Sequence, residues 1–171
     1  MTLELLYNAH KELVFNLALQ YVQNTQDAEE ITQDVFISVH RNLSQFKGES
    51  TAKTWIYRIT INKSLDFIKA KKRNKRWAFL TAKSVDDHSN EVANFSHPGV
   101  ELEHKEELAS LFKSINQLPA RQKTALILLK IEDRSQAVVA EIMELTPKAV
   151  ESLFQRAKKN LEKIINQNEG K

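Results

Sequence analysis

Apolar residues recur at helical spacing through most of the chain, separated by polar positions. The first such stretch runs from Leu3 to Gln23 and loosens at residues 23–25. Asn24 or Thr25 is suited to cap a second helix, whose first turn is acidic, as the helix dipole favours. After a glycine-containing loop at 46–51, a long helix is predicted from about Ala52 to Arg76. The buried stripe predicted for the second helix consists of Ala28, Ile31, Val35, Val39 and Leu43.

This periodicity fails between Trp77 and Lys105, where Ser, Asn, Asp and His are frequent and a Pro98-Gly99 pair occurs. Such composition is typical of a linker. Four further helices are predicted beyond it, over Glu106–Gln117, Ala120–Ile131, Ser135–Met143 and about Pro147–Asn166. The sequence therefore predicts a domain at residues 1–76, a linker at 77–105 and a second domain at 106–171.

Composition supports a helical fold, because the chain has only three Gly and three Pro and few aromatic residues. We expect an all-α protein made of two small helical domains. Cysteine is absent, which excludes disulfides and thiol nucleophiles and fits a reducing, cytoplasmic environment. No apolar run approaches the roughly 18 to 20 residues that a membrane span requires, and the start of the chain does not resemble a signal peptide.

The distribution of charge is uneven, although the net charge is only +3. Residues 1–76 carry 12 basic and 8 acidic side chains, residues 77–105 carry 2 and 5, and residues 106–171 carry 11 and 9. Two basic blocks therefore flank an acidic one. This pattern favours two anion-binding modules joined by the linker.

The last two predicted helices are joined by the short turn 144–146, and the second of them is basic and amphipathic. A helix-turn-helix places its second helix in the major groove of DNA with this arrangement. From charge spacing alone, an ordinary helical hairpin with a solvated face explains the pattern equally well. The residues predicted to reach phosphates and base edges are Lys148, Glu151, Ser152, Gln155, Arg156 and Lys159.

The long helix from Ala52 has a predicted core side, formed by Tyr57, Ile61, Leu65 and Ile68. Trp55 stands near the other side, and a basic cluster ends the helix. Aromatic rings beside cations suit unstacked bases and phosphates. The alternative is that Trp55 belongs to the core and the charges are simply solvated. The available stripe contains Arg58, Asn62, Asp66 and Lys69.

Several of these segments resemble the extracytoplasmic-function sigma factors of bacterial RNA polymerase. Region 2 of that family is similar to Asp27–Phe36, Phe46–Ser50 and Thr54–Ile59, with Asn62 three residues on. Region 4 is similar to Leu118–Gln122 and Ala149–Leu161. The segments occur in the order of the family, with its linker between them, and together they span most of the chain.

The resemblance implies a subunit that gives core polymerase its promoter specificity, helps open the promoter and performs no chemistry itself. The Asp27–Ser44 helix would dock on the β′ clamp of the polymerase, with Gln33, Asp34 and Phe36 as candidate contacts. The further partners implied are the β flap, promoter DNA and an anti-sigma factor, with no cofactor, metal or small-molecule substrate. The last helix would read the −35 element. The candidate residues for binding and opening the −10 element are Phe46, Gly48, Glu49, Ser50, Trp55, Arg58, Asn62, Asp66 and Lys69.

The chain departs from the family pattern in the second domain, where Gln136, Val138 and Glu144 replace an aromatic residue, a Glu and a Gly. We therefore expect a less well capped start to the first helix of the helix-turn-helix. Glu151 and Asp66 would repel phosphate, so any contact they make should be to base edges, as acceptors from cytosine amino groups.

Other classes of protein explain less of the sequence. A stand-alone helix-turn-helix regulator accounts for residues 106–171 but does not explain the loop and the aromatic residues around Trp55. An adaptor that binds only proteins would require both basic faces to be merely solvated. An enzyme ranks lower, because the five histidines show no metal-ligand spacing and no phosphate-binding glycine loop or nucleophile elbow occurs.

Overall fold

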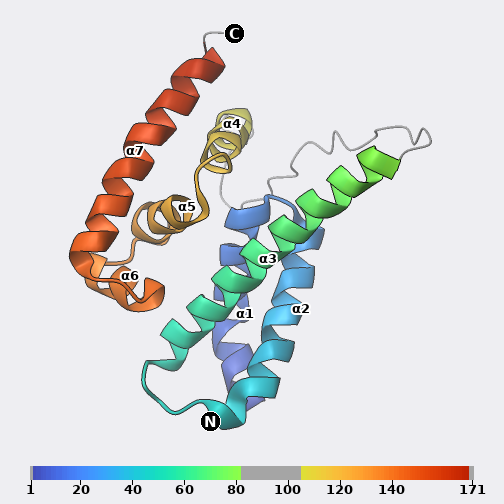
Figure 1. The fold of residues 1–171 in the computed structure, drawn as a ribbon. Coiled ribbons are helices and arrows are strands. Elements are labelled where there is room, and N and C mark those ends of the chain that lie inside the picture. Colours follow the sequence, from blue (N-terminus) through green and yellow to red (C-terminus); the bar gives the residue numbers. More distant parts are fainter. Residues whose placement is uncertain (1, 82–104, 170–171) are drawn as a thin grey trace. The chain divides into compact units, whose positions relative to one another are not determined.

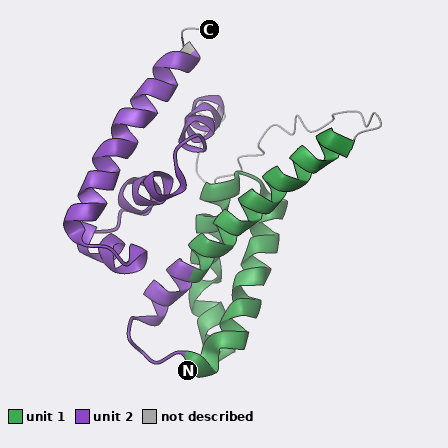
Figure 2. Ribbon diagram, viewed as in Figure 1, with its two compact units in different colours: residues 1–45, 59–96 green, residues 46–58, 97–171 purple. Residues whose placement is uncertain are grey.

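A computed structural model describes residues 2–81 and 105–169. All elements in these two ranges are helical, in agreement with the predicted all-α class. The described chain falls into two compact units, Met1–Gln45 with Ile59–Ser96 and Phe46–Arg58 with His97–Lys171 (Figure 2). Most of the predicted linker lies outside the described residues. Among the described helices, none has the length and apolar character that a membrane crossing requires.

In the first unit, helices α1 (Leu3–Val22) and α2 (Thr25–Asn42) run alongside each other (Figure 1). Asn24 caps α2, since its side-chain oxygen accepts a hydrogen bond of 2.9 Å from the Asp27 amide. Four of the five residues predicted for the buried stripe of α2 are fully buried, whereas Leu43 is half-buried in a 3₁₀ turn, Leu43–Gln45. The side chains of α1 that complete this core include Val14, Leu17, Ala18 and Tyr21.

Helix α3 (Ala52–Thr81) is continuous across the boundary between the units. Of the four residues predicted for its core side, Tyr57 and Ile61 are buried, whereas Leu65 and Ile68 are only half-buried. The core face also includes Ile56, Thr60 and Ser64, which are buried and were not predicted. The helix also extends five residues beyond the predicted end at Arg76. No Gly or Pro stands between residues 52 and 97 to stop it, and Trp, Ala, Phe and Leu are all compatible with a helix.

The second unit contains α4 (Lys105–Ile115), α5 (Ala120–Leu126), α6 (Gln136–Met143) and α7 (Pro147–Glu169). The helix predicted over Ala120–Ile131 is not uniform, because its second half, Ile127–Ile131, is a π-helix. The Glu132 amide accordingly bonds the Ile127 carbonyl five residues back, at 2.9 Å. Val139, Val150 and Ala157 are fully buried and form part of the core of this unit.

The two compact units do not coincide with the predicted domains. Residues 46–58 group with the C-terminal helices, although the sequence assigned them to the first domain. The boundary between the units, at residues 58 and 59, falls inside the continuous helix α3 and is therefore not a linker between domains. The domain boundaries at 76 and 106 stay a prediction.

Candidate polymerase and nucleic-acid interfaces

The predicted docking helix presents some of its candidate residues to solvent and buries one of them. Gln33 and Asp34 are exposed on α2. Phe36 is only 7% exposed and packs edge-on against Tyr7, with ring centroids 4.8 Å apart. Ile37, which is 47% exposed, lies on the same side of the helix as Gln33 and Asp34. Sequence periodicity did not single out Ile37, although an apolar residue outside the buried stripe was the available signal.

The loop before α3 is held by its aromatic residues and by a helix cap. The rings of Phe46 and Trp55 contact each other with centroids 4.9 Å apart and an interplanar angle of 34°. Thr51 caps α3, because its hydroxyl oxygen accepts a hydrogen bond from the Thr54 amide at 3.1 Å. Gly48 adopts φ +73°, a left-handed conformation that favours glycine, and open space surrounds it.

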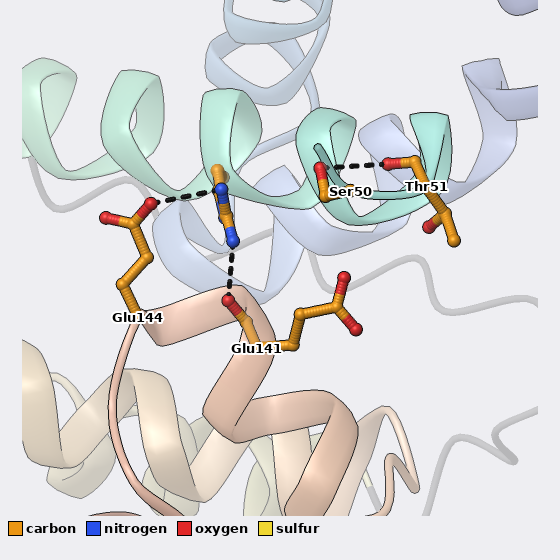
Figure 3. A network of polar contacts seen from close by, with 5 residues as sticks. Ser50, Thr51, Glu141 and Glu144 are labelled. Carbon is orange, nitrogen blue, oxygen red and sulfur yellow. Dashed lines mark hydrogen bonds and ion pairs between the residues drawn. The ribbon is translucent and has the colours of Figure 1, made fainter. Parts of the chain in front are cut away.

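Other polar groups of this loop remain accessible to a ligand. Glu49 is exposed, while Ser50 is half-buried and its hydroxyl donates a long hydrogen bond of 3.4 Å to the Thr51 carbonyl (Figure 3). The Phe46–Trp55 pair therefore fixes an aromatic surface at one side of a loop whose polar side chains are only weakly bound. Such a surface can stack an unpaired base.

On α3, the stripe predicted to face DNA is exposed at Asn62, Asp66 and Lys69. Lys69 and Asp66 form an ion pair with a distance of 3.6 Å between Nζ and Oδ1. Because both side chains are well exposed, this pair contributes little to stability and can be exchanged for a ligand. The stripe thus offers an amide, a carboxylate and a cation on successive turns of one helix.

Arg58, at the start of the same stripe, is held by other parts of the second unit. Its guanidinium donates a hydrogen bond of 2.8 Å from Nη2 to the Glu141 carbonyl and pairs through Nη1 with the Glu144 carboxylate at 3.0 Å (Figure 3). The Arg58 side chain is 28% exposed and that of Glu144 is 72% exposed. Both acceptors belong to the end of α6 and the turn after it. The sequence offered no signal for this contact.

Tyr57 makes a second long-range contact within this unit. Its hydroxyl donates a hydrogen bond of 2.9 Å to Glu132 Oε2. Burial, followed by the negative charge of Glu132, raises the pKa of Tyr57 well above its ordinary value. The phenol is therefore neutral and serves as a fixed donor.

The helix-turn-helix forms where the sequence predicted it. Ser135 caps α6, because its hydroxyl oxygen accepts a hydrogen bond of 3.3 Å from the Val138 amide. The sequence had predicted a less well capped start for this helix. Glu144 ends α6 in the left-handed conformation, with φ +55°. Thr146 then caps α7, since its hydroxyl oxygen accepts a bond of 3.2 Å from the Ala149 amide, and Pro147 is the first residue of that helix.

All six residues predicted for DNA contact on α7 are exposed on one side of that helix. These residues are Lys148, Glu151, Ser152, Gln155, Arg156 and Lys159. Beside this face, the half-buried ring of Phe154 lies below two cations, Lys130 at 5.5 Å and Lys158 at 5.8 Å. These ring contacts hold two further positive charges near α7.

Comparison with known proteins places this geometry in a family. The family model described as Sigma-70 region 2 matches residues 6–74, and that described as Sigma-70, region 4 matches residues 108–161. Together the two matches cover well over half of the chain. The region 2 match contains the α3 stripe, and the region 4 match contains the exposed face of α7.

Curated relatives agree with these matches over nearly the whole length. The RNA polymerase sigma-H factor of Pseudomonas aeruginosa is 28% identical over 166 residues, which is 95% of this chain and 85% of that protein. The ECF RNA polymerase sigma-E factor of Escherichia coli K12 is 28% identical over 170 residues, with 94% and 85% coverage. The chain belongs to the extracytoplasmic-function sigma factors of RNA polymerase.

Solved structures share the fold. The sigma factor RpoE from Bartonella quintana, in complex with the anti-sigma factor NepR, has a TM-score of 0.66 and 20% identity, with 94% of each chain covered. CnrH, in complex with the cytosolic domain of CnrY, has a TM-score of 0.64 and 20% identity, with 96% of this chain and 88% of that chain covered.

Proposed function

We propose that this sigma factor reads promoters through two separate surfaces, the α3 stripe with its preceding loop for the −10 element and the α7 face for the −35 element. The observation that carries the proposal is the common exposure of the six α7 residues on one side of a properly capped helix-turn-helix. Arg156 and Lys159 would contact phosphates, while Ser152 and Gln155 would reach base edges.

For the −10 element we assign the loop 46–51 to an extruded base and α3 to its neighbours. Unstacking a base costs a few kcal/mol, so opening requires a site that offsets this cost. The Phe46–Trp55 ring pair offers a stacking surface, and Glu49 and Ser50 offer polar groups for a base edge. Asn62 and Asp66 would read the exposed neighbouring bases, with Lys69 on the phosphates.

Arg58 has a special position in this assignment. In the structure, its guanidinium is occupied by Glu141 and Glu144. Contact with −10 DNA would replace an exposed carboxylate partner by a phosphate or a base edge, which is a nearly even exchange of charge-assisted hydrogen bonds. The prediction that Arg58 contacts DNA therefore requires this contact to open.

The proposed polymerase contact lies on α2. Gln33 and Asp34 are exposed and available to the β′ clamp, and Ile37 adds an apolar contact between them. Phe36 would act indirectly, because its packing on Tyr7 fixes the helix from within the core. We assign contact with the β flap to the C-terminal domain as the family implies.

Regulation by an anti-sigma factor is proposed because a structural neighbour, RpoE of Bartonella quintana, was solved in complex with an anti-sigma factor. The exposed face of α2 is the site we propose for such an inhibitor, since occupying it would block the polymerase. Acting with core polymerase, the protein would work in the cytoplasm and would catalyse no reaction itself.

Transcription by reconstituted holoenzyme from libraries with either element randomised tests the two-surface assignment. Gln155→Ala should alter the preferred −35 sequence and leave the −10 preference as in the wild type, whereas Asn62→Ala should do the reverse. Lys113→Ala, which removes an exposed cation from α4, is the control for a general loss of charge. If each variant altered both preferences equally, the assignment of separate surfaces would be wrong.

A further inference from the structure

The last turns of α3 expose an unusual group of side chains. Trp77, Phe79 and Leu80 are 69%, 83% and 71% exposed. Four cations that directly precede them, Lys72, Arg73, Lys75 and Arg76, are also exposed, and the described part of the chain shows no ion pair for any of the four. The region 2 match ends at residue 74, before the three apolar residues.

The base of this segment is fixed to the rest of the first unit. Lys71 Nζ lies 2.6 Å from the Asp27 carboxylate in the first turn of α2 and 6.0 Å from the Phe67 ring. Lys71, one cation of the basic cluster, therefore pairs with a residue of α2 and is not available to a ligand.

Arg73, Arg76 and Trp77 continue the stripe formed by Asn62 and Lys69. At 100° per residue these five residues fall within one side of α3, and Trp77 lies about 22 Å beyond Asn62 along the axis. Because α3 is continuous over Ala52–Thr81, the same helix side carries both groups. A strand that follows the stripe past Lys69 would reach two guanidinium groups and then an indole ring.

The chemistry of the segment favours unpaired nucleic acid over other partners. A helix that lies on a membrane needs one apolar side. Trp77 and Phe79 lie roughly 160° apart, and the arc between them, which contains Leu80, also carries three of the four cations, so no side of the segment is purely apolar. A DNA duplex offers phosphates but hides the faces of its bases. Single-stranded DNA offers both phosphates for the arginines and a base for the ring.

We propose that the end of α3 is a second binding site for single-stranded DNA, in which Arg73 and Arg76 hold phosphates and Trp77 stacks on a base. This second site would bind the continuation of the strand whose −10 bases contact Asn62 and Asp66. The proposal rests on the proposed −10 function of α3, because it is the continuity of one helix side that leads the strand to Trp77.

Binding of labelled single-stranded oligonucleotides to holoenzyme, reconstituted from the full chain and core polymerase, tests the site. A short strand would contain only the −10 element, and two longer strands would extend it at the 5′ or the 3′ end. Trp77→Ala should weaken binding of one longer strand by about 5- to 150-fold, the range for losing one stacked base, and leave the short strand unaffected. Trp77→Phe should retain most of the affinity.

Phe79→Ala is the matched control, because it removes another well-exposed ring from the other side of the helix. Equal losses for Trp77→Ala and Phe79→Ala, or unchanged binding of both longer strands by Trp77→Ala, would overturn the proposal. Binding of the chain to anionic phospholipid vesicles that depends on Trp77, with no effect on the oligonucleotides, would assign the segment to a membrane surface instead. The short strand tests the proposed −10 function separately, through Asn62→Ala.

Discussion

Replacing Glu144 by glycine should stabilise the helix-turn-helix, although it removes an ion pair. Glu144 is the αL residue that ends α6, with φ +55° and its amide bonded to the carbonyls of Ala140 and Glu141. A residue with a side chain pays roughly 1–2 kcal/mol for this conformation. Glycine avoids that penalty but brings about 0.5–1 kcal/mol of additional chain entropy to the unfolded state.

The ion pair between Glu144 and Arg58 has a small opposing effect. Since the Glu144 side chain is 72% exposed, solvent screens its charge, and such pairs contribute about 0–1 kcal/mol. Because this exposure places the ion pair at the low end of that range, the net expectation for Glu144→Gly is a gain of roughly 0–1 kcal/mol in the free energy of unfolding, which corresponds to at most about 4–8 °C in the melting midpoint of a small domain.

Circular dichroism during thermal unfolding of the full chain, with hydrogen exchange at the amides of α6, would measure this change. Glu144→Gln separates the two contributions, because it removes the charge and retains the left-handed side chain. It should change stability by less than about 0.5 kcal/mol. If Glu144→Gly and Glu144→Gln lowered stability by the same amount, the ion pair and not the backbone conformation would control this turn.

Three further predictions concern other parts of the chain. Phe36→Ala should destabilise the first unit by about 3–5 kcal/mol, as expected for a buried ring, whereas Ile37→Ala should leave the melting midpoint unchanged and weaken binding to core polymerase in a pull-down titration. Folding stability should decline as pH rises above 10.0, because the raised pKa of Tyr57 means that the unfolded state loses this proton first, and Tyr57→Phe should reduce the decline in denaturant titrations. Lys159→Ala should lower the slope of log affinity for promoter DNA against log salt by about 0.9 if its amine neutralises one phosphate, and an unchanged slope would exclude that contact.

Local signals in the sequence were sufficient for most helices. The start of α2 followed from a capping residue at 24 or 25 and an acidic first turn, and its stripe from the spacing of apolar residues; in the structure the cap is Asn24. The helix-turn-helix followed in the same way from Pro147 and the short turn before it. Such features depend on residues within one or two turns of each other, which is why periodicity and capping rules find them.

Other features depend on partners distant in the sequence. The contacts of Arg58 with Glu141 and Glu144 join residues more than eighty positions apart, and no local pattern indicates them. Phe36 packs against Tyr7 from another helix, a contact that the resemblance, from which Phe36 was predicted as a polymerase contact, does not indicate. The π-helix at Ile127–Ile131 has no propensity signal, because the same apolar residues are compatible with an α-helix.

The most direct test of the whole account is transcription by core RNA polymerase with and without this chain, followed by sequencing of the transcript starts. We predict that the chain redirects the polymerase to new start sites that share two sequence elements upstream, and that the chain alone does not bind these promoters specifically. Specific duplex binding by the free chain, with no change in where the polymerase starts, would show a stand-alone regulator and contradict the assignment.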